Sequence, residues 1–204
     1  MRGEPGARIP DQGRIVAEFV GGPTDGTLGQ VPRHVVFLGP MGSGKTTVGR
    51  LLAERLSRVF VDSDEQLARR FGLSGREVEA RSGVDVLHAA EVEALIEAIG
   101  TEEPSVIAAA AAVADSSEAM TAVSRSDVAI VVLESPYDVL TRRMRAGDHR
   151  RSISLEQFQS LTGRRRLVLS ALAPVAVVDT SSVTPEKAVE QIMQSMSDLR
   201  WRRC

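Results

Sequence analysis

Cysteine is almost absent from this chain of 204 residues, since Cys204 is its one cysteine. No disulfide can form within the chain, and a reducing cytoplasm is the compartment that we expect. The sequence has no run of 18 or more apolar residues and no apolar signal-peptide core, so we expect neither a membrane span nor a membrane partner. The net charge of −2 argues against broad nucleic-acid binding.

Lysine is almost as scarce. Lys45 and Lys187 are the two lysines among 25 basic residues, and the other 23 are arginines. Lys45 lies in the glycine-rich stretch GPMGSGKTT. A compact ammonium suits some sites where a planar guanidinium does not. In a chain that uses arginine almost everywhere else, this lysine indicates a specific chemical requirement.

The stretch around Lys45 matches the phosphate-binding P-loop pattern, G-x-x-x-x-G-K-[ST]. Four apolar residues, 35–38, precede it, and apolar residues at helical spacing follow it. Glycines permit positive φ and let backbone N–H groups converge on an anion. The lysine would contact the β- and γ-phosphates of ATP, and the Thr46 hydroxyl would ligate Mg²⁺. The predicted nucleotide-binding residues are Gly39, Gly42, Ser43, Gly44, Lys45, Thr46 and Thr47.

Apolar strand-like segments alternate with helical patterns along the rest of the chain. The predicted strands are 35–38, 59–64, 105–111, 128–134 and 175–179. Helices are predicted after the P-loop, over 65–72, 85–99, 116–125 and 135–145, and from Ser154 and Thr184 onward. Continuous apolar strands separated by helices indicate a parallel sheet covered on both faces. The predicted fold class is therefore α/β, a three-layer P-loop NTPase fold with a five-stranded parallel sheet and a small lid.

The segment GPMGSGKTTVGRLLAERLSRVFVDSDEQL resembles the start of shikimate kinases, which are P-loop phosphotransferases related to nucleoside-monophosphate kinases. The resemblance extends over residues 33–193. It implies transfer of the γ-phosphoryl group of ATP to a hydroxyl of a small metabolite, shikimate being the family default. It also implies a kinase domain over 33–200 with a lid at 147–154. The loose pattern of Gly, Pro, Asp and Thr in residues 1–32 predicts a flexible N-terminal extension, with an extra docked strand or a partner-binding segment as the alternatives, and residues 201–204 are expected to be a basic tail.

Two aspartates close the second predicted strand, and the resemblance gives each a role. Asp62 is implied to reach the Mg²⁺ shell through water. Asp64 is implied to hold the acceptor hydroxyls and to orient or deprotonate the one that attacks. Taken without the resemblance, the pair is also compatible with a strand-end turn or a helix cap.

Two acceptor-site positions depart from the family pattern. By ungapped alignment, His88 occupies the place of an arginine that pairs with the substrate carboxylate bidentately. The run AAAAA, residues 108–112, stands where the family has three glycines, and alanine lacks glycine's freedom to adopt positive φ. These departures leave open a nucleotide-binding paralogue without kinase activity, and a kinase for another small alcohol such as gluconate.

The resemblance assigns three further arginines. Arg151, with Arg150 as a register alternative, would contact the transferring phosphate from the lid. Arg166 would bind the acceptor carboxylate, and Arg142 would lie against the adenine. The alternative is that these arginines form a solvated basic face. Because Asp64 is retained together with Lys45 and Thr46, we favour a working kinase, expected to act as a monomer on ATP and a small hydroxylated substrate.

Overall fold

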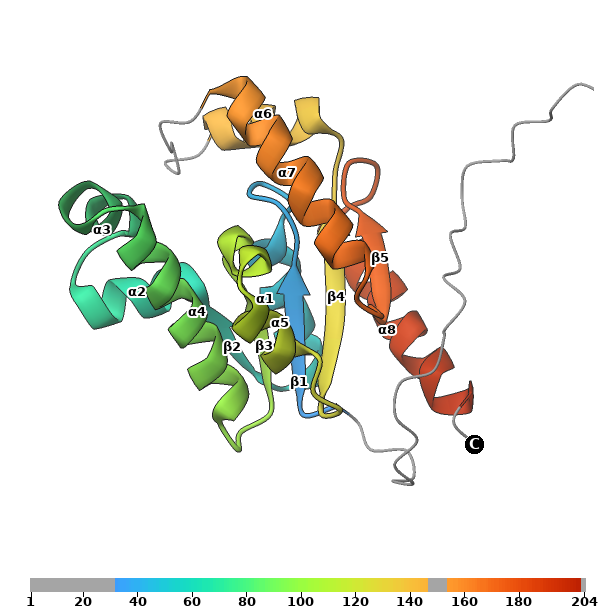
Figure 1. The fold of residues 1–204 in the computed structure, drawn as a ribbon. Helices are drawn as coiled ribbons and strands as arrows, with labels where there is room; N and C mark the ends of the chain where they lie inside the picture. The colour runs from blue at the N-terminus through green and yellow to red at the C-terminus, as the bar shows by residue number, and fades with distance from the viewer. Residues whose placement is uncertain (1–31, 147–153, 203–204) are drawn as a thin grey trace, which may run out of the picture.

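The computed structural model describes residues 32–146 and 154–202. Five parallel strands form one sheet in the order β2-β3-β1-β4-β5, and helices cover both of its faces (Figure 1). The strands are β1 (His34–Leu38), β2 (Val59–Asp62), β3 (Ser105–Ala108), β4 (Val128–Glu134) and β5 (Ala176–Asp179). The predicted α/β fold is confirmed. The predicted lid arginines, Arg150 and Arg151, lie outside the described residues.

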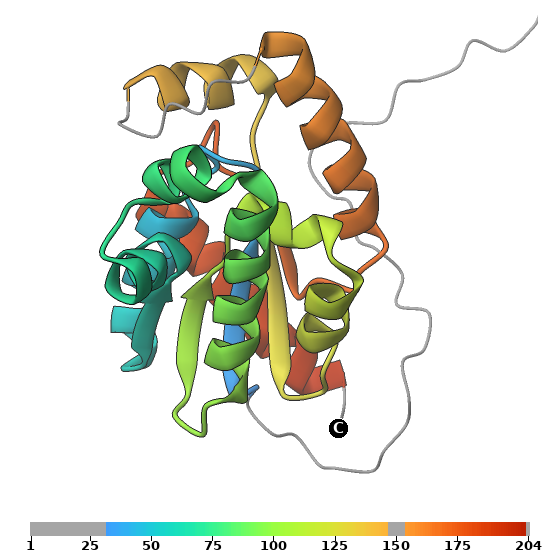
Figure 2. The ribbon, with the colours of Figure 1, turned by 60° about the vertical axis from the view of Figure 1, so that its left-hand side comes forward.

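The sheet is buried on both faces because alternate side chains of the central strands enter different cores. In β1, Val35 and Phe37 belong to the core under α1 (Lys45–Leu56) and α8 (Pro185–Arg202). Val36 and Leu38 belong to the opposite core. That second core is covered by α4 (Val84–Gly100), α5 (Ser117–Val123) and the C-terminal end of α7 (Leu155–Ser170). Figure 2 shows these helices on the near face of the sheet.

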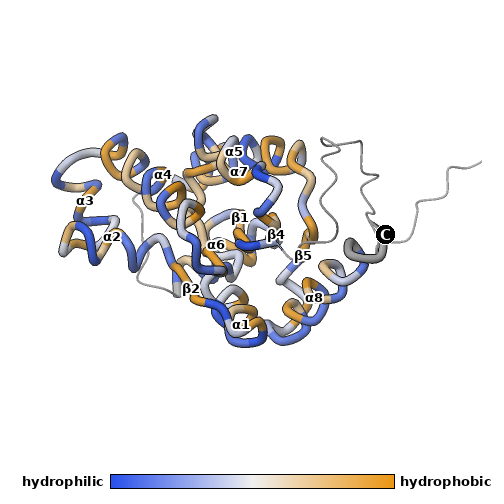
Figure 3. The backbone as a smooth tube through the Cα atoms, turned by 90° about the horizontal axis from the view of Figure 1, so that it is seen from below, coloured by the Kyte–Doolittle hydropathy of each residue, from blue (hydrophilic) through white to orange (hydrophobic). Residues whose placement is uncertain are grey.

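A small helical subdomain lies beyond the edge strand β2. It consists of α2 (Ser63–Phe71) and α3 (Gly75–Ser82), which pack on the first half of α4 (Figure 3). The contacts bury Leu67, Val78, Leu87 and Ala90 in a third apolar cluster. The sequence prediction did not separate α3 as a helix, although Ser74 and Glu77 form the capping box that begins it.

The carboxyl ends of the strands meet at one edge of the sheet, and this edge carries the P-loop. There two predicted strands end earlier than expected. β2 ends at Asp62 rather than at residue 64, because Asp62 caps α2 and Asp64 lies in that helix. β3 ends at Ala108 rather than at residue 111, and the 3-10 helix η1 (Ala111–Asp115) follows. The predicted cap of α7 is confirmed, since Ser154 and Gln157 form a capping box. Above this edge runs α6 (Tyr137–Ala146) (Figure 1). None of the described helices is both long and apolar enough to span a bilayer.

A buried histidine at the opposite edge makes stability depend on pH. The side chain of His34 is fully buried in β1, with Nδ1 2.8 Å from Ser105 Oγ of β3. Burial lowers its pKa below the ordinary value of 6.5. As pH falls below about 6.5, the unfolded chain therefore takes up a proton that the folded chain does not, so the free energy of unfolding decreases.

We predict that His34→Gln loses less stability than the wild type when pH is lowered from 7.5 to 5.5. The measurement is urea denaturation of both proteins at the two pH values. Comparing the two differences removes any constant cost of the substitution. Equal losses of stability in the two proteins would show that the pKa of His34 is the same in the folded and unfolded states.

Candidate active site

Glycines shape the loop between β1 and α1. Gly39, Gly42 and Gly44 all have positive φ, at 138°, 81° and 94°. Two features of Gly39 exclude a side chain. Its positive φ disfavours any residue other than glycine, and an added Cβ would overlap the carbonyl oxygen of Leu133 in β4. The loop therefore passes against the central strand with its backbone closer than any other residue type would permit.

Lys45, the first residue of α1, reaches back across this loop. Its Nζ donates hydrogen bonds to the carbonyl oxygens of Gly39, at 2.9 Å, and Pro40, at 3.0 Å. Burial lowers its pKa to about 8, although the carboxylates of Asp64 and Asp62 act in the opposite direction. The ammonium therefore lies in a poorly hydrated place where an anion would stabilise its charge.

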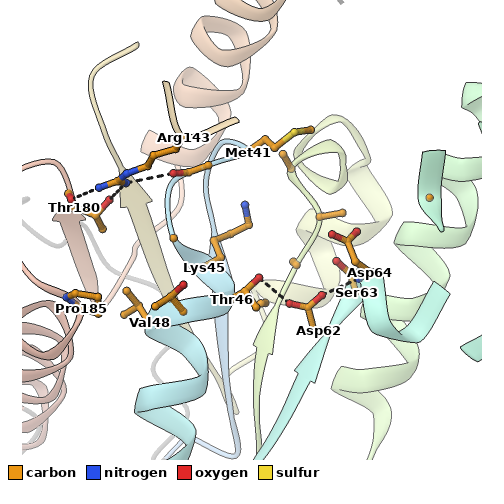
Figure 4. A pocket seen from close by; sticks show the side chains of 18 of the residues that line it. Met41, Lys45, Thr46, Val48, Asp62, Ser63, Asp64, Arg143, Thr180 and Pro185 are labelled. Atoms are coloured by element: carbon orange, nitrogen blue, oxygen red, sulfur yellow. Dashed lines mark hydrogen bonds between the residues drawn. The ribbon is translucent and has the colours of Figure 1, made fainter. Parts of the chain in front are cut away.

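Asp62 connects the P-loop helix to α2. Thr46 Oγ1 donates to Asp62 Oδ2 at 2.8 Å, and Asp62 Oδ1 accepts from the backbone N–H of Asp64 at 2.9 Å (Figure 4). Asp62 is thus the N-cap of α2 and also a partner of the loop threonine. The predicted helix cap is thus confirmed, and the buried cap fixes the start of the helix that carries Asp64.

A cavity of about 880 Å³ brings most of the predicted residues together. Figure 4 shows Lys45 and Thr46 between Arg143, Thr180 and Pro185 on one side and Asp62, Ser63 and Asp64 on the other. Gly42, Gly44 and Thr47 also line it. Ser43 does not: its side chain is fully buried under the loop and makes no hydrogen bond with the described residues.

Arg143, rather than the predicted Arg142, lines the nucleotide end of the cavity. Its Nη1 donates to the carbonyl oxygen of Gly42 at 3.2 Å and to Thr180 Oγ1 at 2.9 Å, and its Nη2 donates to the carbonyl oxygen of Thr180 at 2.7 Å. Arg142 is exposed. Successive residues of a helix point about 100° apart, so two adjacent arginines cannot both face the loop. Sequence reasoning missed Arg143 and also Thr180, whose hydroxyl donates to the carbonyl oxygen of Ser43 at 2.9 Å.

The predicted acceptor residues line two adjoining cavities. Asp64 lines the larger one, while His88 and Arg166 line a second cavity of about 300 Å³. Both cavities share Met41 of the P-loop and Ala111. The two cavities therefore adjoin at the P-loop and the start of η1.

Among the arginines of α7, Arg165 has the least exposed side chain. Its side chain is 13% exposed and donates from Nε, at 3.0 Å, and from Nη2, at 2.6 Å, to Asp115 Oδ2. The predicted Arg166 is 69% exposed and pairs with Glu134 at 2.8 Å. Phe158 and Leu169, which are buried in α7, lie at helical spacing from Arg165 and share its face. Arg165, the neighbour of the predicted Arg166, is therefore the arginine of this run that lies on the packed face of α7.

The alanine run fits its place without backbone strain. Among the described residues, positive φ occurs at five glycines and Ser57, and Ala110 has φ −60° and ψ 148°. The loss of glycine's freedom expected at residues 108–112 thus has no consequence for this backbone. Ala108, Ala109, Ala110 and Ala111 line the larger cavity, so their methyl groups make part of its wall apolar.

Comparisons with known proteins agree with this geometry. Residues 41–197 match the family model for shikimate kinase. The shikimate kinase of Symbiobacterium thermophilum is 30% identical over 170 residues, covering 81% of this chain and 97% of that protein. That of Thermobifida fusca is 31% identical over 168 residues, covering 79% and 93%. The structure of Acinetobacter baumannii shikimate kinase in complex with shikimate superposes with a TM-score of 0.75 at 23% identity, covering 84% of this chain and 96% of that one.

Proposed function

The chain belongs to the shikimate kinase family, and from that premise we propose that it transfers the γ-phosphoryl group of ATP to a hydroxyl of shikimate, giving shikimate 3-phosphate. One observation carries the proposal beyond family membership. The P-loop lysine and the carboxylate of Asp64 line the same cavity, so a phosphate held by Lys45 faces a group able to accept a hydroxyl proton. A nucleotide-binding protein without kinase activity would not need the second of these.

We propose that ATP binds with its phosphates on the P-loop and its base toward α6 and β5. The backbone amides of the loop and the ammonium of Lys45 would hold the β- and γ-phosphates. Arg143 and Thr180 connect α6, the loop and the end of β5. They would line the part of the cavity that holds the base and ribose. Arg142 would then lie outside the contact made with the adenine.

Magnesium fits the opposite side of the loop. The hydrogen bond between Thr46 Oγ1 and Asp62 Oδ2 places two side-chain oxygens next to each other beside Lys45. Mg²⁺ in such enzymes takes one or two protein oxygens, with phosphates and water completing its shell. We propose that Thr46 ligates it directly and Asp62 through water. When bound, Mg²⁺ neutralises the charge of the phosphates.

The proposed mechanism is direct in-line transfer. Asp64 accepts or orients the proton of the attacking hydroxyl while the bond from the γ-phosphorus to the bridging oxygen of ATP breaks. Lys45 stabilises the charge that develops on the transferring group. Residues 147–154 are proposed as the lid that excludes water, with Arg151 contacting the same phosphoryl group. The described residues of one chain supply both ends of the cavity, so we propose that the monomer is active.

The function is tested by incubating purified protein with ATP, Mg²⁺ and one acceptor at a time, and measuring ADP release and the phosphorylated product. We expect shikimate to be phosphorylated in preference to gluconate and other small alcohols. Turnover of gluconate but not of shikimate would show that the protein is a kinase and that shikimate is not its acceptor. Nucleotide binding without turnover of any acceptor would show the non-enzymatic alternative.

We further propose that Arg165 binds the acceptor carboxylate together with His88, and that Arg166 does not. Arg165→Ala should raise the KM for shikimate by about 10- to 100-fold, because a charge-assisted hydrogen bond contributes about 1.5–3 kcal/mol. Arg166→Ala is the matched control and should change KM by less than about threefold, since exposed ion pairs contribute little. Steady-state kinetics on the two variants measures this, and the reverse order of effects would restore Arg166 to the site.

A further inference from the structure

Each arginine of the α7 run already has a carboxylate partner from its own chain. Arg166 pairs with Glu134 at the end of β4. Arg164 and Arg165 share Asp115, the last residue of η1: Arg164 Nη2 donates to Oδ1 at 3.1 Å, while Arg165 donates twice to Oδ2. The least exposed guanidinium that lines the second cavity, that of Arg165, is therefore partly neutralised before any acceptor arrives.

Asp115 remains ionised in this arrangement. Burial by itself raises the pKa of a carboxyl, but the hydrogen bonds and charges of Arg165 and Arg164 outweigh it, so the pKa of Asp115 is lowered. The side chains of Asp115 and Arg165 are 27% and 13% exposed, so solvent screens the pair only in part. A negative charge thus stands permanently beside the cation that an acceptor carboxylate would use.

Two opposite effects of Asp115 on that carboxylate have to be weighed. By fixing the Nε edge of Arg165, Asp115 reduces the side-chain entropy lost on binding. Asp115 also repels the acceptor carboxylate, because both carboxylates would then bind the same guanidinium. In a partly buried site this repulsion between unit charges exceeds the entropy of one arginine side chain. The net effect of Asp115 is therefore to weaken carboxylate binding.

We propose that Asp115 is a specificity-determining residue of the acceptor site: by occupying Arg165 it lowers the affinity for the carboxylate of shikimate relative to an uncharged analogue. This inference rests on the proposed function.

The test compares two acceptors on two proteins. Shikimate and its methyl ester, which lacks the negative charge, are assayed as acceptors with wild type and Asp115→Asn at saturating MgATP. We expect the substitution to lower the KM for shikimate about tenfold, the effect of removing one nearby like charge, with kcat and the KM for the ester within about twofold. Titration calorimetry of shikimate into the MgADP complex should show the same gain in affinity.

Glu134→Gln is the matched control, because it removes the same charge from the same cavity but from the exposed Arg166. We expect it to change the KM for shikimate by less than about threefold. An equal decrease in both variants would mean a general field effect and would overturn the role of Asp115. A rise in the KM for shikimate in Asp115→Asn would also overturn this role. So would parallel changes in KM for shikimate and its methyl ester, because these would indicate a positioning or structural role. A wild type that binds MgADP but phosphorylates neither acceptor overturns the proposed function, and the assignment of Asp115 with it.

Discussion

Asp64→Asn should abolish shikimate phosphorylation and leave nucleotide binding intact. The amide has the size of the carboxylate but cannot accept the hydroxyl proton, and general-base groups contribute on the order of 10²–10⁴ in rate. The backbone N–H of Asp64, which Asp62 caps, is unchanged by the substitution, so α2 should begin at the same place. The measurements are kcat from ADP release and the dissociation constant of MgADP from calorimetry.

The control for Asp64 is Asp127→Asn. Asp127 precedes β4 at the far edge of the sheet, where its carboxylate pairs with Arg125 at 2.8 Å, so the substitution changes the net charge equally without reaching the site. We expect its kcat to match the wild type. If Asp64→Asn retains more than about a tenth of the wild-type kcat, proton transfer to Asp64 is not part of the mechanism.

The sequence was sufficient to predict the shape of the P-loop because backbone geometry dictates it. A P-loop needs glycines at fixed spacing for positive φ, and Gly39, Gly42 and Gly44 have the conformations that the pattern predicts. Asp62 was predicted from the resemblance to the family, and in the structure it ends β2 and accepts a hydrogen bond from Thr46 of the P-loop helix. Local spacing is preserved wherever strand, loop and helix follow one another without an insertion.

The arginines were harder to predict because their registers depend on segments whose geometry the sequence does not fix. The prediction of Arg166 was made by counting residues back from Thr180, across the turn between α7 and β5. If that turn is one residue longer or shorter than in the family, the count reaches a neighbouring arginine such as Arg165. On α6, the apolar pattern does not distinguish Arg142 from Arg143, since contacts with Gly42 and Thr180 decide which one faces the loop. Asp115 gave no signal of its own, because its partners are about 50 residues away in sequence.

The alanine run shows a different kind of difficulty. A family pattern of three glycines suggests that positive φ is needed, yet the chain turns from β3 into η1 with Ala110 in an extended conformation. The change from glycine therefore acts on the lining of the cavity rather than on the backbone. An apolar wall opposite Asp64 and Lys45 favours the exclusion of water from the reacting groups.

Nucleotide affinity should decrease as pH rises above about 8, and this dependence should come from Lys45. In the free protein burial lowers the pKa of Lys45 to about 8, so half of the molecules have lost the proton at that pH. Bound phosphates favour the charged ammonium and raise its pKa. Binding above pH 8 must therefore take up a proton, and each further pH unit should weaken binding about tenfold. The phosphates themselves titrate near pH 6 and contribute nothing in this range.

Calorimetry with MgADP at pH 7, 8 and 9, in buffers of different ionisation enthalpy, measures both the affinity and the proton uptake. For the wild type we expect proton uptake to be small at pH 7 and to approach one proton per nucleotide at pH 9, because the pKa of Lys45 in the free protein is about 8. Lys45→Ala should lose most of the affinity, and with it most of the rise in melting temperature that MgADP gives to the wild type. Lys45→Arg is the informative control, because a guanidinium stays charged up to pH 12 or above. It should bind with an affinity that does not change between pH 7 and 9. A wild type whose affinity is equally flat would show that Lys45 is already fully protonated at pH 9, and that burial by the loop does not depress its pKa.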